Sequence, residues 1–227
     1  MKRTRENHLI GMFILLAAAI LLLSARIFAA PAASAGQFSI KSFSNSSVSL
    51  DITMPGSNDI RAQVEVCNLQ GQTIGNDNAS ASYPVAYITG SFGTNKVYLC
   101  RMRYYDHVWD SNTYQYVDIY GDWSTYKAFC NLQPKASLVN KKSRNVIIKM
   151  PKVAGAKNMT LYMSTSQNSG YKKIATIKPG KSKILKGFKG KSFQYGKWYY
   201  YIIKINLNNG VPCEMYMNGF QITRRFF

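Results

Sequence analysis

Apolar and polar residues alternate along most of the chain after its first 35 residues, which is the pattern of half-buried β-strands. One strand sequence occurs twice, because Leu50–Pro55 recurs as Val146–Pro151 about 100 residues later. Each copy also has a phenylalanine six residues before a tyrosine, as Phe92 with Tyr98 and as Phe193 with Tyr199. A repeat of this length is a whole domain rather than a solenoid unit. The pattern therefore predicts two β domains in tandem.

Residues 1–35 have the features of an export signal. A basic start precedes an apolar run from Leu9 to Leu23, and Ala33–Ala35 is a small-residue cleavage site. The run of 15 residues is shorter than the ~20 that a transmembrane helix needs. We therefore expect a secreted or cell-surface protein with a cleaved signal peptide. An uncleaved N-terminal membrane anchor is the alternative.

The first domain is predicted to cover residues 36–131 and the second domain residues 132–227, joined by a short linker at Gln133 and Pro134. So brief a connection favours an end-to-end rod with limited bending. In the first domain, Asn76–Ser82 is small and polar and is interpreted as a loop. No helix is expected after the signal. The predicted strands are Gln37–Phe43, Val48–Met54, Ala62–Val66 with Gln72–Ile74, Lys96–Asp106, Trp123–Cys130, Val146–Met150, Met159–Met163, Tyr171–Ile177, Lys183–Phe188, Trp198–Leu207, Val211–Met217 and Phe220–Thr223.

Seven or so short strands in each domain are typical of a β-sandwich. The sequence resembles fibronectin type III repeats of the kind secreted or surface-displayed by Gram-positive bacteria. The residues that carry the resemblance are Tyr98–Arg103, Tyr120–Ser124, Lys152–Ala156, Ser164–Ser166, Tyr171–Thr176 and Gly196–Tyr201. Tyr98 and Tyr199 fall where that family has its tyrosine corner. The resemblance implies an all-β fold, with two immunoglobulin-like (fibronectin type III) β-sandwiches in tandem after an N-terminal signal helix.

The distribution of titratable residues argues against catalysis, which needs converging acid and base groups. The second domain has one carboxylate side chain, Glu214, and no histidine. The first domain has His107 beside Asp106 and Asp110, which we interpret as a polar loop rather than a metal site, since metal sites require fixed geometry. No nucleophile elbow, phosphate loop or zinc spacing occurs. We expect no enzyme activity, no cofactor and no metal.

The segment from Asp106 to Gly121 combines aromatic rings with carboxylates, which together can stack on a sugar and accept hydrogen bonds from it. Its candidate carbohydrate-binding residues are Trp109, Tyr114, Tyr116, Tyr120, Asp110 and Asp118. The alternative interpretation is an extended hairpin whose aromatic side chains pack across the two strands.

Four cysteines follow the signal, and four cysteines allow three disulfide connectivities. Alternation places Cys100 with Tyr98 and Met102, and it also turns Cys130 inward on a neighbouring strand. Because alternation turns both Cys100 and Cys130 inward, a Cys100–Cys130 bridge is the favoured disulfide. By the same alternation, Cys67 should point outward. Free core thiols are the alternative.

Charge is segregated between the domains. Residues 36–131 contain 6 basic and 8 acidic residues, whereas residues 132–227 contain 19 basic residues against Glu214 alone. So one-sided a charge stores repulsion that a polyanion would relieve, and lysine, which outnumbers arginine there, favours diffuse contact over bidentate recognition. The predicted contact residues are Lys141, Lys142, Arg144, Lys172, Lys173, Lys178, Lys181, Lys183, Lys186, Lys189, Lys191 and Lys197.

These features favour a non-catalytic extracellular or cell-surface binding or adhesion module. Its basic second domain would contact an anionic polymer or surface, such as a cell-wall polymer, a glycosaminoglycan, an anionic lipid or extracellular DNA. The alternative is a carbohydrate-binding or enzyme accessory module that uses the aromatic segment of the first domain. Carbohydrate or another surface protein is therefore a further candidate partner.

Overall fold

The computed structural model describes residues 36–56, 60–140, 142–214 and 216–222, and strands are the regular elements of these ranges. The predicted signal, residues 1–35, lies outside the described residues. Within the described ranges, no helix has the length and hydropathy to span a membrane.

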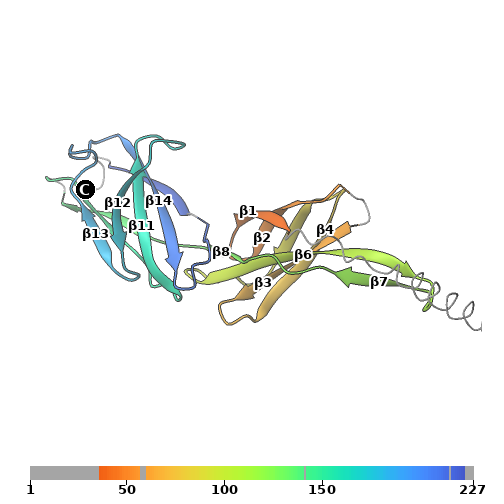
Figure 1. The fold of residues 1–227 in the computed structure, drawn as a ribbon. Helices are drawn as coiled ribbons and strands as arrows, with labels where there is room; N and C mark the ends of the chain where they lie inside the picture. The colour runs from red at the N-terminus through yellow and green to blue at the C-terminus, as the bar shows by residue number, and fades with distance from the viewer. Residues whose placement is uncertain (1–35, 57–59, 141, 215, 223–227) are drawn as a thin grey trace, which may run out of the picture.

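The strands of residues 37–130 form two antiparallel sheets (Figure 1). The smaller sheet has the order β1-β2-β5, from β1 (Gln37–Phe43), β2 (Ser47–Thr53) and β5 (Val85–Thr89). The larger sheet has the order β4-β3-β6-β7, from β4 (Thr73–Ser80), β3 (Ile60–Asn68), β6 (Val97–Asp110) and β7 (Gln115–Tyr120). A short strand, β8 (Lys127–Cys130), pairs with the start of β6.

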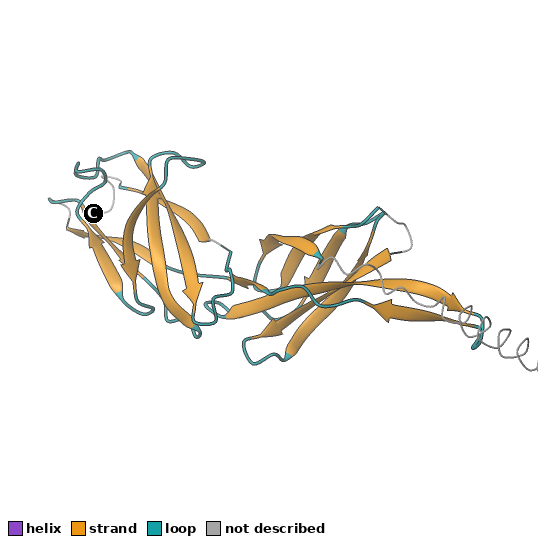
Figure 2. Ribbon diagram, viewed as in Figure 1, coloured by secondary structure: helices purple, strands orange, loops and turns teal. Residues whose placement is uncertain are grey.

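The strands of residues 135–221 form a second pair of antiparallel sheets (Figure 2). One has the order β13-β10-β9, from β13 (Ser182–Leu185), β10 (Asn145–Lys149) and β9 (Lys135–Asn140). The other has the order β12-β11-β14-β15, from β12 (Lys172–Ile177), β11 (Ala156–Ser164), β14 (Trp198–Leu207) and β15 (Tyr216–Gln221). The described part of the chain is therefore all-β, as the alternation predicts.

The repeated phenylalanine and tyrosine make the same contacts in both domains. The Tyr98 hydroxyl accepts a hydrogen bond from the Gly93 N–H at 2.7 Å, and the Tyr199 hydroxyl accepts one from the Gln194 N–H at 3.1 Å. Each tyrosine ring also meets its phenylalanine edge-on, with centroids 5.0 Å apart for Phe92 and 4.7 Å apart for Phe193. Edge-to-face pairs of this kind stabilise a core beyond simple burial. The sequence repeat is thus a repeat of core geometry.

Two sequence interpretations of the first domain are wrong in detail. Asn76–Ser82, interpreted as a loop, lies mostly in β4, an edge strand that pairs with β3 from Arg61 to Cys67. Ala79 is the one buried side chain of β4, so polar residues are tolerated along the rest of this edge strand and hide the strand pattern. The segment after Asp106 is also a strand, because β6 continues to Asp110 and pairs with β7.

The two domains meet end to end, and the outer face of β6 and β8 is covered at this end (Figure 1). Cys67, predicted to point outward, is 1% exposed. It belongs to one apolar cluster with Leu99 and Cys130 of the first domain and with Cys213 of the second domain. The outward prediction assumed that the first sheet faces water on one side. At the junction, the Tyr126 side chain, which bonds Cys67, and the apolar residues that the two domains share take the place of that water.

Candidate binding surfaces

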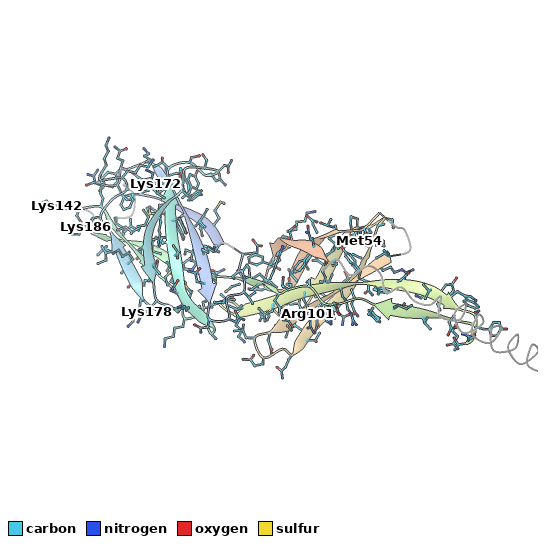
Figure 3. All side chains as sticks on the ribbon, in the orientation of Figure 1. Met54, Arg101, Lys142, Lys172, Lys178 and Lys186 are labelled. Atoms are coloured by element: carbon cyan, nitrogen blue, oxygen red, sulfur yellow. The ribbon has the colours of Figure 1, made fainter. Side chains whose placement is uncertain are left out.

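The predicted basic residues are spread around the second domain rather than gathered on one face. Lys142, Lys172, Lys178 and Lys186 point away from the body of the domain on different sides (Figure 3). Lys141 lies outside the described residues. The remaining predicted lysines are exposed as well, namely Lys173, Lys181, Lys183, Lys189, Lys191 and Lys197. The side chains thus form a diffuse basic shell.

Arg144 differs from these lysines because its side chain is half-buried. Its backbone has a φ of +55° in the turn before β10, and its guanidinium lies 5.8 Å from the centre of the Tyr195 ring. A guanidinium over an aromatic face is held by the ring quadrupole. Arg144 therefore joins two segments of its own domain as well as adding charge.

The ion pairs of the described residues all lie in the first domain. Their N–O distances are 3.1 Å for Lys41 with Asp51, 2.8 Å for Arg101 with Glu65 and 2.6 Å for His107 with Asp118. The described lysines of the second domain have no such carboxylate partner, since Glu214 is the one acidic side chain in residues 132–227. Their charge is therefore balanced by solvent ions or by a ligand.

The aromatic segment of the first domain is a two-stranded hairpin made by the second half of β6 and by β7, and it projects beyond the sandwich (Figure 1). Trp109 pairs with Tyr116 across the strands, with their ring centroids 5.2 Å apart. Tyr116 also stacks on His107 at 4.7 Å. The cross-strand interpretation is therefore the correct description of the packing. Even so, Trp109, Tyr116 and Tyr114 remain 53%, 61% and 77% exposed.

Hydrogen bonds hold both predicted acidic residues of the hairpin in their ionised form. The bond from His107 to Asp118 lowers the pKa of the Asp118 carboxyl, and a bond from Tyr120 contributes further. The backbone N–H of Asn112 and the Thr113 hydroxyl lower the pKa of Asp110 at the hairpin turn. Carboxylates that accept hydrogen bonds favour the charged state. Both carboxylates are thus already engaged within the hairpin.

Near the base of the hairpin, arginines of β6 lie against aromatic rings at the end of β7 and in the segment that follows it. The guanidinium of Arg103 lies 3.8 Å from the Tyr120 ring and 4.5 Å from the Trp123 ring, and that of Arg101 lies 4.3 Å from Trp123. Arg101 also donates a hydrogen bond to Glu65. Burial by itself would raise the pKa of the Glu65 carboxyl, but the hydrogen bonds from Thr73 and Arg101 outweigh it, so the pKa is lowered. These contacts fasten the segment after β7 to the sheet.

The predicted disulfide Cys100–Cys130 is wrong, and all four cysteines are free thiols in the structure. Cys100 pairs with Lys127 and Cys130 pairs with Val97, so the two cysteines face opposite sides of the sheet. Cys100 lies in the core of the first sandwich, and Cys130 lies in the junction cluster. Both faces of the sheet are apolar at this end of the domain. Alternation with apolar neighbours therefore could not show that Cys100 and Cys130 lie on opposite faces.

Among the described residues, no three His, Cys, Asp or Glu side chains are placed to hold a metal ion. A cavity of about 340 Å³ lies beside β1 and β8, lined by Gly36, Phe38, Thr53, Ser124, Lys127 and their neighbours. Its one charged lining group, the Lys127 ammonium, donates a hydrogen bond to the Phe38 carbonyl. This cavity lacks the paired titratable groups of general acid–base chemistry.

Sequence reasoning missed a third surface, the outer face of the sheet β12-β11-β14-β15. On β14 the inward residues are buried, but the outward residues Trp198, Tyr200 and Ile202 are apolar too. The signal is in the sequence: residues 198–203 are apolar or aromatic at every position, whereas a strand with one wet face should alternate. The outer face of β14 therefore carries a row of partly exposed aromatic and apolar side chains.

No family model matches the chain, and no curated protein matches it. Solved structures with detectable similarity include a two-domain fibronectin type III segment of chicken tenascin, with 8% identity over 82% of this chain and 97% of that chain and a TM-score of 0.31. A cytokine receptor complex has 9% identity over 82% of this chain and 96% of that chain, with a TM-score of 0.37. The central fibronectin type III array of RIM-binding protein has 13% identity over 84% and 61%, with a TM-score of 0.26. At these scores the similarity carries no functional conclusion.

Proposed function

We propose that this chain is a non-catalytic extracellular or cell-surface binding module whose second domain holds an anionic polymer. The observation that carries the proposal is the set of exposed lysines of that domain, which have no carboxylate partner among the described residues. Because the lysines lie on several sides, they suit a long, flexible polyanion better than one compact anionic ligand. The resemblance to fibronectin type III repeats supports a binding role rather than catalysis.

Counterion release gives this proposal a quantitative signature. Lysines that lack acidic partners gather anions from solution, and a polyanion displaces them on binding. For about five phosphate contacts, a fourfold rise in salt should weaken binding about 500-fold. A glycosaminoglycan or a wall polymer should show the same direction of change, because the effect depends on charge rather than on sequence.

The test measures heparin, teichoic acid and DNA binding to the full-length protein as salt is raised. Changing Lys172, Lys173 and Lys178 to Gln should flatten the logarithmic salt slope by roughly one unit for each lysine lost. Lys96→Gln in the first domain makes the same change on an exposed lysine and should leave the slope unchanged. If none of the three polymers binds at low salt, the charge serves solubility and the proposal is wrong.

A carbohydrate-binding or enzyme accessory role is the second candidate, favoured by the exposure of Trp109, Tyr114 and Tyr116 on the projecting hairpin. Rings held on a rigid hairpin can stack on a sugar without loss of side-chain freedom. Combining Trp109→Ala with Tyr116→Ala should abolish any binding to a glycan array. Binding that survives this double substitution would remove the hairpin as the sugar site.

A further inference from the structure

Two aromatic rings lie side by side on the outer face of the second domain's four-stranded sheet. Trp198 and Tyr200 are two residues apart on β14, and their ring planes are 17° apart with centroids separated by 6.1 Å. Both rings lie over Gly219 of β15: a Cβ added to that glycine would meet Tyr200 at 3.1 Å and Trp198 at 3.5 Å. The absent side chain of Gly219 thus lets the rings lie close to the sheet.

Covering a glycine is one role for these rings, because an aromatic ring over a strand glycine protects the backbone there. That role leaves Trp198 49% exposed. Apolar residues continue the surface down the sheet, since Ile202 pairs with Tyr162 on one side and with Met217, which is 50% exposed, on the other. Protection of one glycine does not require so long an apolar stripe.

Lysines stand on the same face as the rings. Lys204 follows Ile202 in the outward alternation of β14, and Lys173 pairs with Tyr162 at the other end of the Ile202 row. Both lysines are exposed. The face therefore combines an aromatic stripe with positive charge at its rim, two properties that a single ligand can use together.

We propose that this face binds single-stranded nucleic acid, with bases stacking on Trp198 and Tyr200 and phosphates contacting Lys173 and Lys204. Every base has a flat face, so stacking platforms beside a basic track hold single strands with little sequence preference. The proposal rests on the proposed polyanion binding and adds the chemical class of the polymer. It also assigns a role to rings that a purely electrostatic contact would not need.

The geometry disfavours two other ligands. An uncharged sugar chain could stack on the rings but would leave the lysines of the same face without a partner. A duplex keeps its bases paired and stacked, so its phosphates can reach the lysines but its bases cannot reach the rings.

The test compares Trp198→Ala with the unaltered full-length protein by fluorescence anisotropy, using a labelled oligo-dT strand of about 16 nucleotides. Loss of a stacking ring should weaken oligo-dT binding about tenfold, whereas binding to duplex DNA of equal length and to heparin should change less than about twofold. Trp198→Phe keeps a ring and should keep most of the affinity. Tyr87→Ala removes an aromatic ring of similar exposure from the first domain and should have no effect.

Each other outcome overturns the inference in its own way. Unchanged oligo-dT binding by Trp198→Ala leaves the polyanion function standing and removes the stacking role. Equal losses for oligo-dT and duplex point to a folding defect or to charge alone, and both contradict a base-stacking face. Binding to phosphatidylserine vesicles or to an uncharged polysaccharide that depends on Trp198, without such dependence for oligo-dT, assigns the face to that ligand. Absence of all polyanion binding at low salt removes the proposed function as well.

Discussion

The backbone of Ala128 in the first domain is hydrogen-bonded to the strand-like segment around Cys213 in the second. Ala128 N–H donates to the Pro212 carbonyl at 2.8 Å, and Glu214 N–H donates to the Ala128 carbonyl at 2.8 Å, which makes a parallel bridge. The second domain thereby adds an edge to β8, and Cys213 lies near Cys130 in the apolar cluster of the junction. A hydrogen-bonded, apolar junction of this kind restrains the angle between the domains.

Cys213→Asp should loosen this junction. The side chain is 7% exposed among apolar neighbours, so a carboxylate there is left without hydrogen bonds and should lower the free energy of unfolding by at least about 2 kcal/mol. Thermal unfolding and the radius of gyration from small-angle scattering would measure the effect. Cys213→Ala is the control and should cost much less. If the aspartate variant keeps the parent's melting temperature and radius, the junction is not held as described.

The cysteines should be unreactive in the folded protein. Burial raises the pKa of the Cys130 thiol to about 12, and burial together with the nearby Cys130 raises that of Cys213 to about 12. Burial also raises the pKa of Cys100. The thiolate is the nucleophile, so alkylation near neutral pH should be slow until the chain is denatured. Mass spectrometry without reduction should then find four modified cysteines. A Cys100–Cys130 cross-linked peptide would contradict the structure.

Acid should weaken the hairpin. The pKa of Asp118 is lowered in the folded state, first by its hydrogen bond with His107, so ionised Asp118 stabilises the hairpin above the ordinary carboxyl pKa of about 4. That contribution is lost as the pH falls through the lowered value. Asp118→Asn should therefore lower the melting temperature near neutral pH, by an amount that reflects less than about 1 kcal/mol for so exposed a pair.

The difference between Asp118→Asn and the parent should disappear by about pH 2, where both side chains are uncharged. Asp122→Asn makes the same chemical change on an exposed residue just past the hairpin and serves as the control. A difference between Asp118→Asn and the parent that persists at low pH would show that the bond with His107 is not the cause.

Trp123→Ala should destabilise the first domain. The indole lies between two guanidinium groups, at 4.5 Å from Arg103 and 4.3 Å from Arg101, and each cation–π contact is worth about 0.5–1 kcal/mol at a partly exposed site. With the buried indole area, the expected loss is about 2 kcal/mol, measured by denaturant unfolding. Trp109→Ala, which removes a ring from the hairpin, is the control. Equal losses for the two variants would contradict a structural role for this stack.

The sequence by itself determined the strands whose inward residues are large and apolar. β14 spans the predicted Trp198–Leu207, and Tyr98 and Tyr199 make the backbone hydrogen bonds that the tyrosine corner implies. Alternation is a local property, so it can be read without knowing which elements meet. Local pattern failed at β4, because an edge strand needs no apolar side chains, and at β15, which begins later than the predicted Val211.

Tertiary structure decided which faces of the sheets are covered. This determines both the burial of the cysteines and the exposure of the candidate binding residues. Cys67 and Cys130 are buried because the second domain covers the outer face of the first sheet at its end. Trp198, on the outer face of β14, stays half-exposed. Likewise, the Asp106–Gly121 segment became a hairpin with its rings paired across strands. Alternation states that a residue faces one side or the other, but only the packing of distant segments states what lies on that side.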